Sequence, residues 1–319
     1  WLLLAIQAGQ ALAFSVPVRD DPHARAVKLV AQMTLEEKVR LCQGNYSAIA
    51  EHDYVGVVSG VPRLGVPDLY MNDGPEGYRA SPAYPGTSTQ WPSGLTAAHS
   101  WDLGLLQAWG SAMGAEFYGK GATVAFGPGA NIARIANGGR SFEYLSGEDP
   151  YLGNQLVRPV VRGIQSQGVI ANVKHFMDNN QEGVFLPGKT PPFGPGDRHS
   201  TSAEVDERTQ MEIYFPPFEG AVEAGVLSVM CANNLINGEY ACQSNKTQNG
   251  VLRASSQFKG WICSDYDGTR STVDAALGGL DIAMPGAHVS PAFTHPDFFG
   301  SMLIKVVLLF ALNYCLPLN

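Results

Sequence analysis

The sequence lacks the motifs of several large enzyme classes. It has no GxxxxGK[ST] phosphate loop, and Gly127-Pro128-Gly129 lacks the third glycine of a dinucleotide fingerprint. It also has no GxSxG elbow for serine-hydrolase chemistry, and its seven histidines show no HExxH spacing. Its five cysteines form no CxxC pair, which argues against structural zinc. We therefore predict neither a cofactor nor a bound metal.

Charge is also scarce. Charged residues make up 16% of the 319 residues, below the roughly 25% of an average domain. Acidic residues outnumber basic ones by 29 to 21, so the chain lacks the basic surface that a nucleic-acid partner requires. The 45% hydrophobic share is ample for a packed core. The length fits two average domains, or one α/β barrel with additional ends.

The N-terminus has the form of a secretory signal peptide. An apolar run over residues 1–6 is followed by Ala11-Leu12-Ala13, which resembles a cleavage site. The alternative is a buried N-terminal helix. The first residue is not Met and no basic segment precedes the apolar run, so we expect that residues 1–13 are an incomplete signal peptide. Glycosylation triplets at Asn45 and Asn245 also fit a secreted, extracellular protein.

Residues 301–319 form a second unusual segment. They are mostly apolar, but Lys305 interrupts them, and the run 306–312 is shorter than the roughly 20 residues of a membrane span. We therefore predict no membrane span. The segment is either a final helix packed on the body or sequence that does not belong to the fold.

Six short apolar runs alternate with stretches of helical spacing. Helical spacing covers residues 103–117, 149–167 and 206–224, and Pro216-Pro217 should break the last of these. The apolar runs are residues 66–71, 122–126, 169–173, 226–230, 261–264 and 280–284. Nearly continuous apolar strands that alternate with helices predict a parallel sheet buried on both faces.

The polar residues that follow these runs favour a closed sheet over an open one. Asp73, Lys174-His175, Asn233-Asn234 and Asp265 follow four different strands. An open sheet gathers ligands at one switch point, whereas a barrel collects side chains from many strand ends. We predict an α/β fold of the TIM-type (β/α)8-like barrel class. With six clear runs, the other two strands must be weaker, near residues 55–61 or after Gly139, and the barrel would be irregular or incomplete.

These polar residues suit a ligand with many hydroxyl groups. Asp73 could accept hydrogen bonds from sugar hydroxyls, Arg140 could counter nearby carboxylates, and Asp265 could act as a nucleophile beside Tyr266. Three of these positions have an ordinary structural alternative: a turn aspartate for Asp73, an ion pair for Arg140 and a solvated strand end for Lys174-His175.

Taken in chain order, the motifs resemble a known family. They lie at residues 72–79 (NDGPEGYR), 138–150 (GGRSFEYLSGEDP), 173–176 (VKHF), 205–209 (VDERT) with 212–214 (EIY), 229–231 (VMC), 262–266 (ICSDY) and 279–286 (GLDIAMPG). Over about residues 25–290 the chain resembles the N-terminal domain of glycoside hydrolase family 3, and most of all its secreted β-glucosidases. The resemblance implies a TIM-type barrel that hydrolyses terminal non-reducing β-D-glucosyl residues of glucosides or oligosaccharides with retention.

The resemblance also implies roles for individual residues. Asp265 matches the nucleophile, Arg208 matches a supporting position, and Tyr266 stands where a tryptophan platform is usual. Cys231 and Cys242 match a local disulfide of the secreted members. The positions that match the sugar-binding residues are Asp73, Arg79, Arg140, Lys174, His175 and Met230.

Two departures from the family pattern bear on catalysis. Asn233 stands where many relatives have a tyrosine that hydrogen-bonds the nucleophile. The family's general acid/base comes from a second domain, and the resemblance stops near Gly286; Glu143, Glu148 and Glu182 are candidates only through proximity in the sequence. We therefore predict a truncated chain with weak or no activity. The competing hypothesis is a non-catalytic sugar-binding protein that keeps the pocket.

Overall fold

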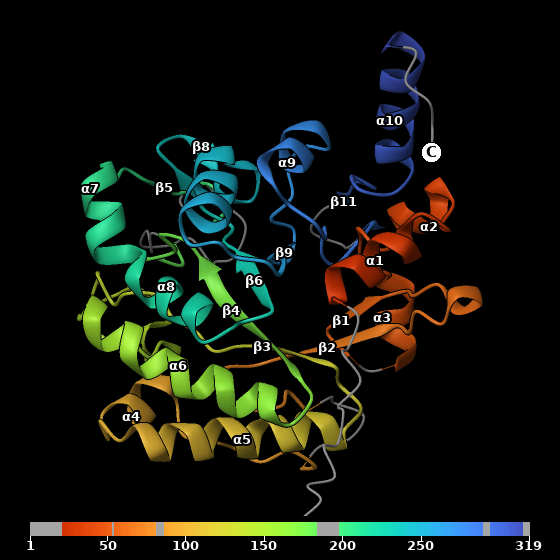
Figure 1. The fold of residues 1–319 in the computed structure, drawn as a ribbon. Coiled ribbons are helices and arrows are strands. Elements are labelled where there is room, and N and C mark those ends of the chain that lie inside the picture. Colours follow the sequence, from red (N-terminus) through yellow and green to blue (C-terminus); the bar gives the residue numbers. More distant parts are fainter. Residues whose placement is uncertain (1–20, 53, 81–85, 184–197, 290–293, 315–319) are drawn as a thin grey trace, which may run out of the picture.

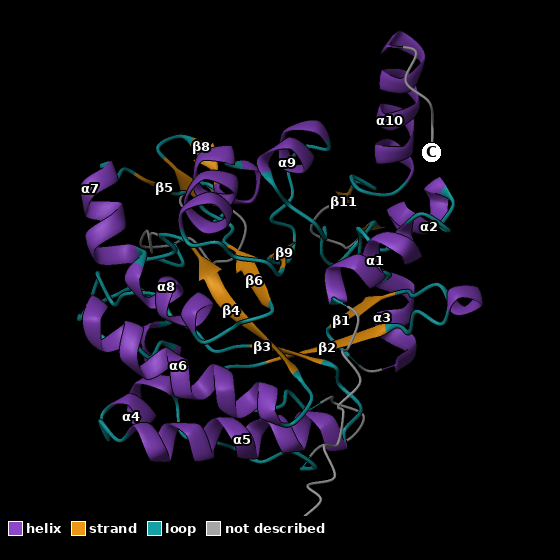
Figure 2. Ribbon diagram, viewed as in Figure 1, coloured by secondary structure: helices purple, strands orange, loops and turns teal. Residues whose placement is uncertain are grey.

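The computed structural model describes residues 21–52, 54–80, 86–183, 198–289 and 294–314. The predicted signal peptide at residues 1–13 lies outside them, as do Cys315 and the last residues of the apolar tail. Figure 2 shows strands at the centre of the molecule and helices around them.

The central sheet contains six strands in the order β1-β2-β3-β4-β6-β9. These are β1 (Gly56–Val58), β2 (Leu69–Asp73), β3 (Val124–Phe126), β4 (Ile170–Phe176), β6 (Ser228–Cys231) and β9 (Trp261–Ser264). All neighbours are parallel except β1, which is antiparallel to β2. Residues 59–68 are too few for the crossover helix that a parallel pair requires.

Two short segments continue the sheet from β9 back toward β1. Ile282 bridges Cys263 of β9, and the backbone N–H of Ala283 donates to the carbonyl of Cys42 (2.9 Å). The N–H of Asn45 then donates to the carbonyl of Val57 in β1 (2.7 Å). The sheet is thus an irregular, incomplete barrel, as predicted.

The predicted strands were confirmed in part. Five of the six apolar runs overlap the strands β2, β3, β4, β6 and β9, and the weak run at 55–61 contains β1. The run 280–284 forms only isolated bridges. The expectation of a strand after Gly139 was wrong: Ser141–Glu143 is a 3₁₀ helix, and Tyr144 forms only an isolated bridge to Gly129.

Helices cover the outside of the sheet (Figure 1). The α-helices of the described residues are α1 (Pro22–Val30), α2 (Leu35–Arg40), α3 (Tyr46–His52), α4 (Gly94–Ala98), α5 (Leu103–Gly119), α6 (Pro150–Ser166), α7 (Glu207–Thr209), α8 (Pro216–Glu223), α9 (Val273–Gly278) and α10 (Ser301–Tyr314). The 3₁₀ helices are η1 (Pro62–Leu64), η2 (Ser141–Glu143) and η4 (Ala241–Gln243), and the π-helices are η3 (Gln210–Tyr214) and η5 (Lys246–Ser255). Two smaller sheets contain β5 (Ser202–Ala203), β7 (Leu235–Ile236) and β8 (Glu239–Tyr240), and β10 (His288–Val289) with β11 (Thr294–His295).

The sequence predicted the outer helices well. Residues 103–117 and 149–167 form α5 and α6, and the predicted helix over 206–224 is interrupted before Pro216. Helices α5 and α6 approach closely because Gly110 and Gly163 face each other's helix: a Cβ on Gly110 would lie 2.7 Å from the Val160 carbonyl oxygen. Helices α5, α6 and α8 bury the main core against the sheet.

A second, smaller core fills the inside of the curled sheet. Its buried members are Val58, Met71, Val124, Phe126, Met230, Cys263, Ile282 and Met284. Successive side chains of a strand point to opposite faces, so Asp73 shares the inner face with Met71. This core therefore forms the floor under the polar strand ends.

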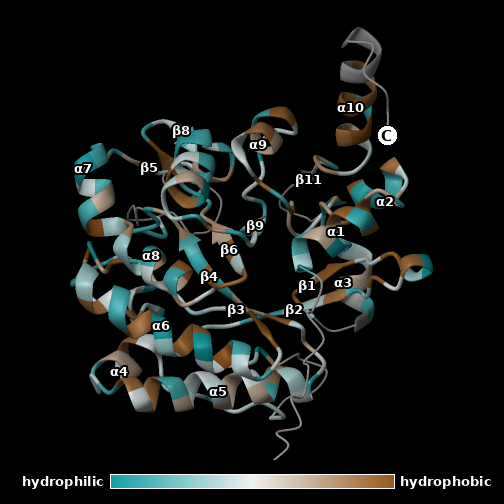
Figure 3. Ribbon diagram, in the orientation of Figure 1, coloured by the Kyte–Doolittle hydropathy of each residue, from teal (hydrophilic) through white to brown (hydrophobic). Residues whose placement is uncertain are grey.

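The apolar tail forms α10, which extends away from the body (Figure 1), and the part of it coloured by hydropathy is mostly hydrophobic (Figure 3). Leu303 packs against the main core, while Met302, Leu308 and Leu309 are exposed. Within the described residues, no helix combines the length and hydropathy needed to cross a bilayer.

Candidate functional site

Asp73 at the end of β2 lies between two cations. Its Oδ1 is 3.4 Å from Nζ of Lys174 in β4, and its Oδ2 accepts a hydrogen bond from Nη1 of Arg79 (3.2 Å). Burial raises the pKa of Asp73, but Lys174 and Arg79 outweigh this effect and lower it below its ordinary value. Asp73 therefore stays anionic at neutral pH.

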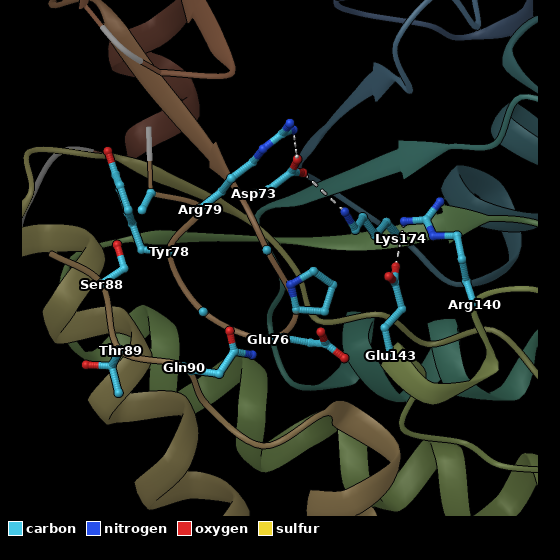
Figure 4. A pocket seen from close by; sticks show the side chains of 14 residues that line it. Asp73, Glu76, Tyr78, Arg79, Ser88, Thr89, Gln90, Arg140, Glu143 and Lys174 are labelled. Atoms are coloured by element: carbon cyan, nitrogen blue, oxygen red, sulfur yellow. Dashed lines mark hydrogen bonds and ion pairs between the residues drawn. The ribbon is translucent and has the colours of Figure 1, made fainter. Parts of the chain in front are cut away.

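A cavity of about 450 Å³ opens beside this pair, a size within the usual range for small-molecule sites. Figure 4 shows Lys174 between Asp73 and Arg140, with Glu143 beside Arg140 and Glu76 below Lys174 in this view. Its charged lining residues are Asp73, Glu76, Arg79, Arg140, Glu143 and Lys174. Such a lining offers donors and acceptors on several sides of a small polar ligand.

Arg140 precedes η2 and pairs with two carboxylates. Its Nη2 donates to Glu143 Oε1 (2.6 Å), and its Nη1 lies 3.5 Å from Glu182 Oε1. Burial lowers the pKa of Arg140. The Tyr144 phenol and nearby carboxylates, Asp265 among them, outweigh burial, so the pKa of Arg140 lies above its ordinary value. Burial, and then the charge of Glu143, raise the pKa of Glu76. Arg140 thus remains a cation, and Asp265 is among the charges that stabilise it.

Asp265 follows β9 and is 7% exposed. Its Oδ1 accepts the backbone N–H of Tyr266 (2.7 Å). Its Oδ2 lies 3.7 Å from Nε2 of His175 and 3.6 Å from Nη1 of Arg198, and has no hydrogen-bond partner among the described residues. One carboxylate oxygen is therefore anchored while the other faces polar groups that a ligand could contact.

His175 is buried and uncharged. Burial lowers its pKa well below the ordinary value, and the charges of Arg140, Lys174 and Arg198 lower it further. Three cations thus surround the imidazole whose Nε2 faces Asp265, which brings the predicted residues Arg140, Lys174, His175 and Asp265 into one cluster.

Sequence reasoning missed Arg198 and left Glu182 unassigned. Arg198 Nη1 lies 3.3 Å from Glu182 Oε2 as well as near Asp265, so this cation links the two carboxylates. Both residues lie in loops after β4, where no strand or helix pattern signals their position. Of the other two acid candidates, Glu143 contacts Arg140 and Glu148 is exposed.

The remaining predicted residues lie in different surroundings. Met230 is buried in the inner core beneath the site. Burial, followed by the charge of Asp73, raises the pKa of Tyr266. Arg208 is not brought to the site: its side chain is 83% exposed and pairs with Glu212 one helical turn away.

The predicted disulfide between Cys231 and Cys242 is present, with the Cα atoms 5.2 Å apart. Asn233, at the position of the expected phenol, is buried, and its side-chain amide has no hydrogen-bond partner among the described residues. A Cβ on Gly268 would lie 3.0 Å from Asn233 Oδ1 and 3.2 Å from the Asp265 carbonyl. Asn233 therefore lies near the Asp265 backbone without hydrogen-bonding its carboxylate.

The two predicted glycosylation positions differ in accessibility. Asn245 is exposed just before η5. Asn45 is half-buried, and its Nδ2, the atom to which a glycan is attached, donates to Ser59 Oγ (2.9 Å). Asn245 is thus the more accessible acceptor. Across the described part of the chain, no three His, Cys, Asp or Glu residues are grouped to hold a metal.

Comparisons with known proteins identify the family of this chain. The model of the glycosyl hydrolase family 3 N-terminal domain matches residues 52–285. The chain is 40% identical over 315 residues to probable beta-glucosidase A of Aspergillus terreus, covering 95% of this chain and 36% of the relative. It therefore spans about a third of the length of the curated relatives it matches.

Solved structures of β-glucosidases also match the chain. The beta-D-glucoside glucohydrolase of Trichoderma reesei matches with a TM-score of 0.79 and 32% identity, over 90% of this chain and 37% of the other. A beta-glucosidase from Streptomyces venezuelae in complex with D-glucose matches with a TM-score of 0.77 and 35% identity, over 92% of this chain and 35% of the other. The chain belongs to glycoside hydrolase family 3, whose N-terminal barrel domain it contains.

Proposed function

We propose that this chain is the sugar-binding barrel of a β-glucosidase and that Asp265 is its nucleophile. The observation that carries the proposal is the position of Asp265 Oδ2: buried, without a hydrogen bond among the described residues, and within 3.7 Å of His175 and Arg198. Beta-glucosidases among the relatives support glucosides as substrates.

The charged cavity supplies the contacts that a terminal glucosyl residue needs. Asp73 accepts hydrogen bonds from sugar hydroxyls, and Lys174 and Arg79 donate them. In a retaining reaction, Asp265 attacks the anomeric carbon, the glycosidic oxygen leaves with a proton, and water then hydrolyses the glycosyl-aspartate ester. Lys174, Arg140 and Arg198 keep positive charge close to the carboxylate that leaves in this second step.

Retaining hydrolysis also needs a second carboxyl group to protonate the leaving oxygen. Glu143 and Glu182 are each engaged by arginine. We propose that the general acid/base comes from outside this chain, as in the family, so the chain alone is slow on natural glucosides. An aryl glucoside with a good leaving group relieves this requirement.

The test uses an activated 2-deoxy-2-fluoro-β-glucoside, which forms the glycosyl-enzyme but hydrolyses slowly. Intact-mass and peptide mass spectrometry should show one adduct on Asp265. Asp265→Ala should abolish it, whereas Asp274→Ala, which removes an exposed carboxylate of α9, should not. Glucose binding without an adduct would favour a non-catalytic sugar-binding protein.

We further propose that the protein is secreted and glycosylated at Asn245. The Cys231–Cys242 disulfide supports an oxidising compartment. Expression through a eukaryotic secretory pathway should give a glycan that an endoglycosidase removes and that Asn245→Gln eliminates. An unchanged mass after Asn245→Gln would contradict the assignment.

A further inference from the structure

A buried tyrosine hydrogen-bonds the imidazole that faces Asp265. The hydroxyl of Tyr144 lies 3.2 Å from Nδ1 of His175, and both residues are at most 3% exposed. The two rings meet edge to face, with their centroids 6.1 Å apart. Tyr144 follows η2, whereas His175 belongs to β4. The contact therefore joins the loop that carries Arg140 to the strand that carries Lys174.

The position of the imidazole is fixed from its backbone as well. The N–H of His175 donates to Asn131 Oδ1 (2.7 Å), and Asn131 Nδ2 donates back to the carbonyl of His175 (2.9 Å). Asn131 is itself buried. With the main chain held on both sides and Nδ1 engaged by Tyr144, the ring keeps Nε2 directed at Asp265 Oδ2, 3.7 Å away.

The remaining choice is which nitrogen carries the proton of the neutral ring. If Nδ1–H donated to the Tyr144 oxygen, a lone pair on Nε2 would face the Asp265 carboxylate. If the Tyr144 hydroxyl donates to Nδ1, the proton lies on Nε2 and faces that carboxylate instead. The second arrangement replaces a repulsion with an attraction. Burial raises the pKa of Tyr144, so the phenol keeps the proton that it donates.

We propose that Tyr144 is a positioning residue that holds His175 as the Nε2–H tautomer, so that an N–H donor rather than a lone pair faces Asp265 and the ligand. The tautomer is a property of the free protein. Its catalytic consequence rests on the proposed function: the N–H donates to a sugar oxygen or to the carboxylate expelled when the glycosyl-enzyme is hydrolysed. The hydrogen bond made by one imidazole nitrogen commonly decides which nitrogen carries the proton.

Long-range ¹H–¹⁵N NMR on the full chain labelled with ¹⁵N-histidine tests the tautomer directly. His175→Gln identifies the His175 signals by their disappearance. In the wild-type protein, Nε2 should be protonated and Nδ1 bare. Tyr144→Phe removes the hydroxyl that donates to Nδ1 but leaves the Asp265 carboxylate facing Nε2, so the share of the Nδ1–H tautomer should rise above its wild-type level. Tyr54→Phe is the matched control, because that hydroxyl donates to the Lys120 carbonyl (2.9 Å) outside the site.

A protonated Nδ1 in the wild-type spectrum overturns the proposal, whether or not Tyr144→Phe folds. An unchanged His175 spectrum in a folded Tyr144→Phe variant overturns it too. With an aryl β-glucoside, Tyr144→Phe should lower kcat/KM about tenfold, the loss expected for one neutral hydrogen bond, and Tyr54→Phe should not lower it. If the wild-type chain shows neither turnover nor an adduct, the proposed function fails while the spectrum still decides the tautomer.

Discussion

The backbone N–H of Asp265 donates to the carbonyl oxygen of Cys231 at 3.0 Å. This bond continues the parallel ladder between β6 and β9 one residue beyond the last strand pair, Cys231 with Ser264. Cys231 is bonded to Cys242. The disulfide therefore restrains the strand end against which Asp265 is placed.

Removing the disulfide should destabilise the protein. Replacing both Cys231 and Cys242 with serine frees a short loop in the unfolded chain, and we expect the free energy of unfolding to fall by about 2–3 kcal/mol. Urea denaturation followed by circular dichroism measures it. Cys42→Ser, which removes a half-buried free thiol, should change the midpoint much less. A double variant as stable as Cys42→Ser would show that the disulfide adds nothing to stability.

Much of the site could be predicted because parallel strands end at one edge of a sheet. Asp73, Lys174 and Asp265 each follow an apolar run, so the pattern that predicted β2, β4 and β9 also predicted their side chains together. Arg198 could not be found in this way, because it lies in a loop and only the folded chain brings it within 3.6 Å of Asp265. Arg208 matched a motif, yet it extends into solvent.

The fold was predictable to a similar extent. Strand runs and helical spacing are local signals, and they placed α5, α6 and five of the strands. The antiparallel direction of β1 depends on the shortness of the connection to β2, and the closure through Cys42, Asn45 and Ala283 depends on isolated backbone hydrogen bonds between distant segments. Hydrophobic periodicity carries no information about such bonds.

Asp178 should make stability depend on pH. It is 2% exposed, its Oδ2 accepts from Gln210 Nε2 (2.8 Å), and burial raises its pKa to about 6. The folded state then binds a proton more tightly than the unfolded state does, so its contribution to stability falls as pH rises from about 4 to about 6 and stays low above that. Asp178→Asn keeps the acceptor oxygen and removes the charge. It should raise the free energy of unfolding at pH 7 by about 2–3 kcal/mol.

Urea denaturation of the wild type and Asp178→Asn at several pH values between 4 and 8 measures this difference. His175, whose pKa is lowered, gives the opposite slope below its unfolded pKa, but it is present in both proteins and cancels in the comparison. Asp102→Asn, at the exposed N-cap of α5, should leave stability unchanged because asparagine caps equally well. Equal stability of Asp178→Asn and wild type at pH 7 would refute the prediction.

Arg140 should be needed for folding stability as well as for ligand binding. Arg140→Met leaves Glu143 and Glu182 without this cation in a partly buried setting where Glu76 is close by. Leaving charges unpaired is costly there, and we expect a loss of about 3 kcal/mol in urea denaturation. Arg63→Met breaks an exposed ion pair with Glu37 and should have little effect. Similar losses for the two variants would show that the Arg140 network adds no more stability than a surface pair.

Lys174 should control both the strength and the pH dependence of sugar binding. Lys174→Met removes the cation 3.4 Å from Asp73 and leaves Arg79, whose side chain is 67% exposed, as its charged partner. One charged donor to the sugar is lost, so calorimetric titration with glucose at pH 7 should show about 100-fold weaker affinity, the cost of a charge-assisted hydrogen bond in a buried site.

The same substitution raises the pKa of Asp73 toward its ordinary range, because the charge of Lys174 lowers that pKa more than the charge of Arg79 does. A protonated Asp73 accepts hydrogen bonds less well. As the pH is lowered, the affinity of the variant for the sugar should therefore begin to fall at a higher pH than that of the wild type. Lys246→Met, which removes an exposed lysine paired with Glu207, should change neither quantity. Unaltered affinity and pH dependence in Lys174→Met would mean that the sugar does not bind between Asp73 and Lys174.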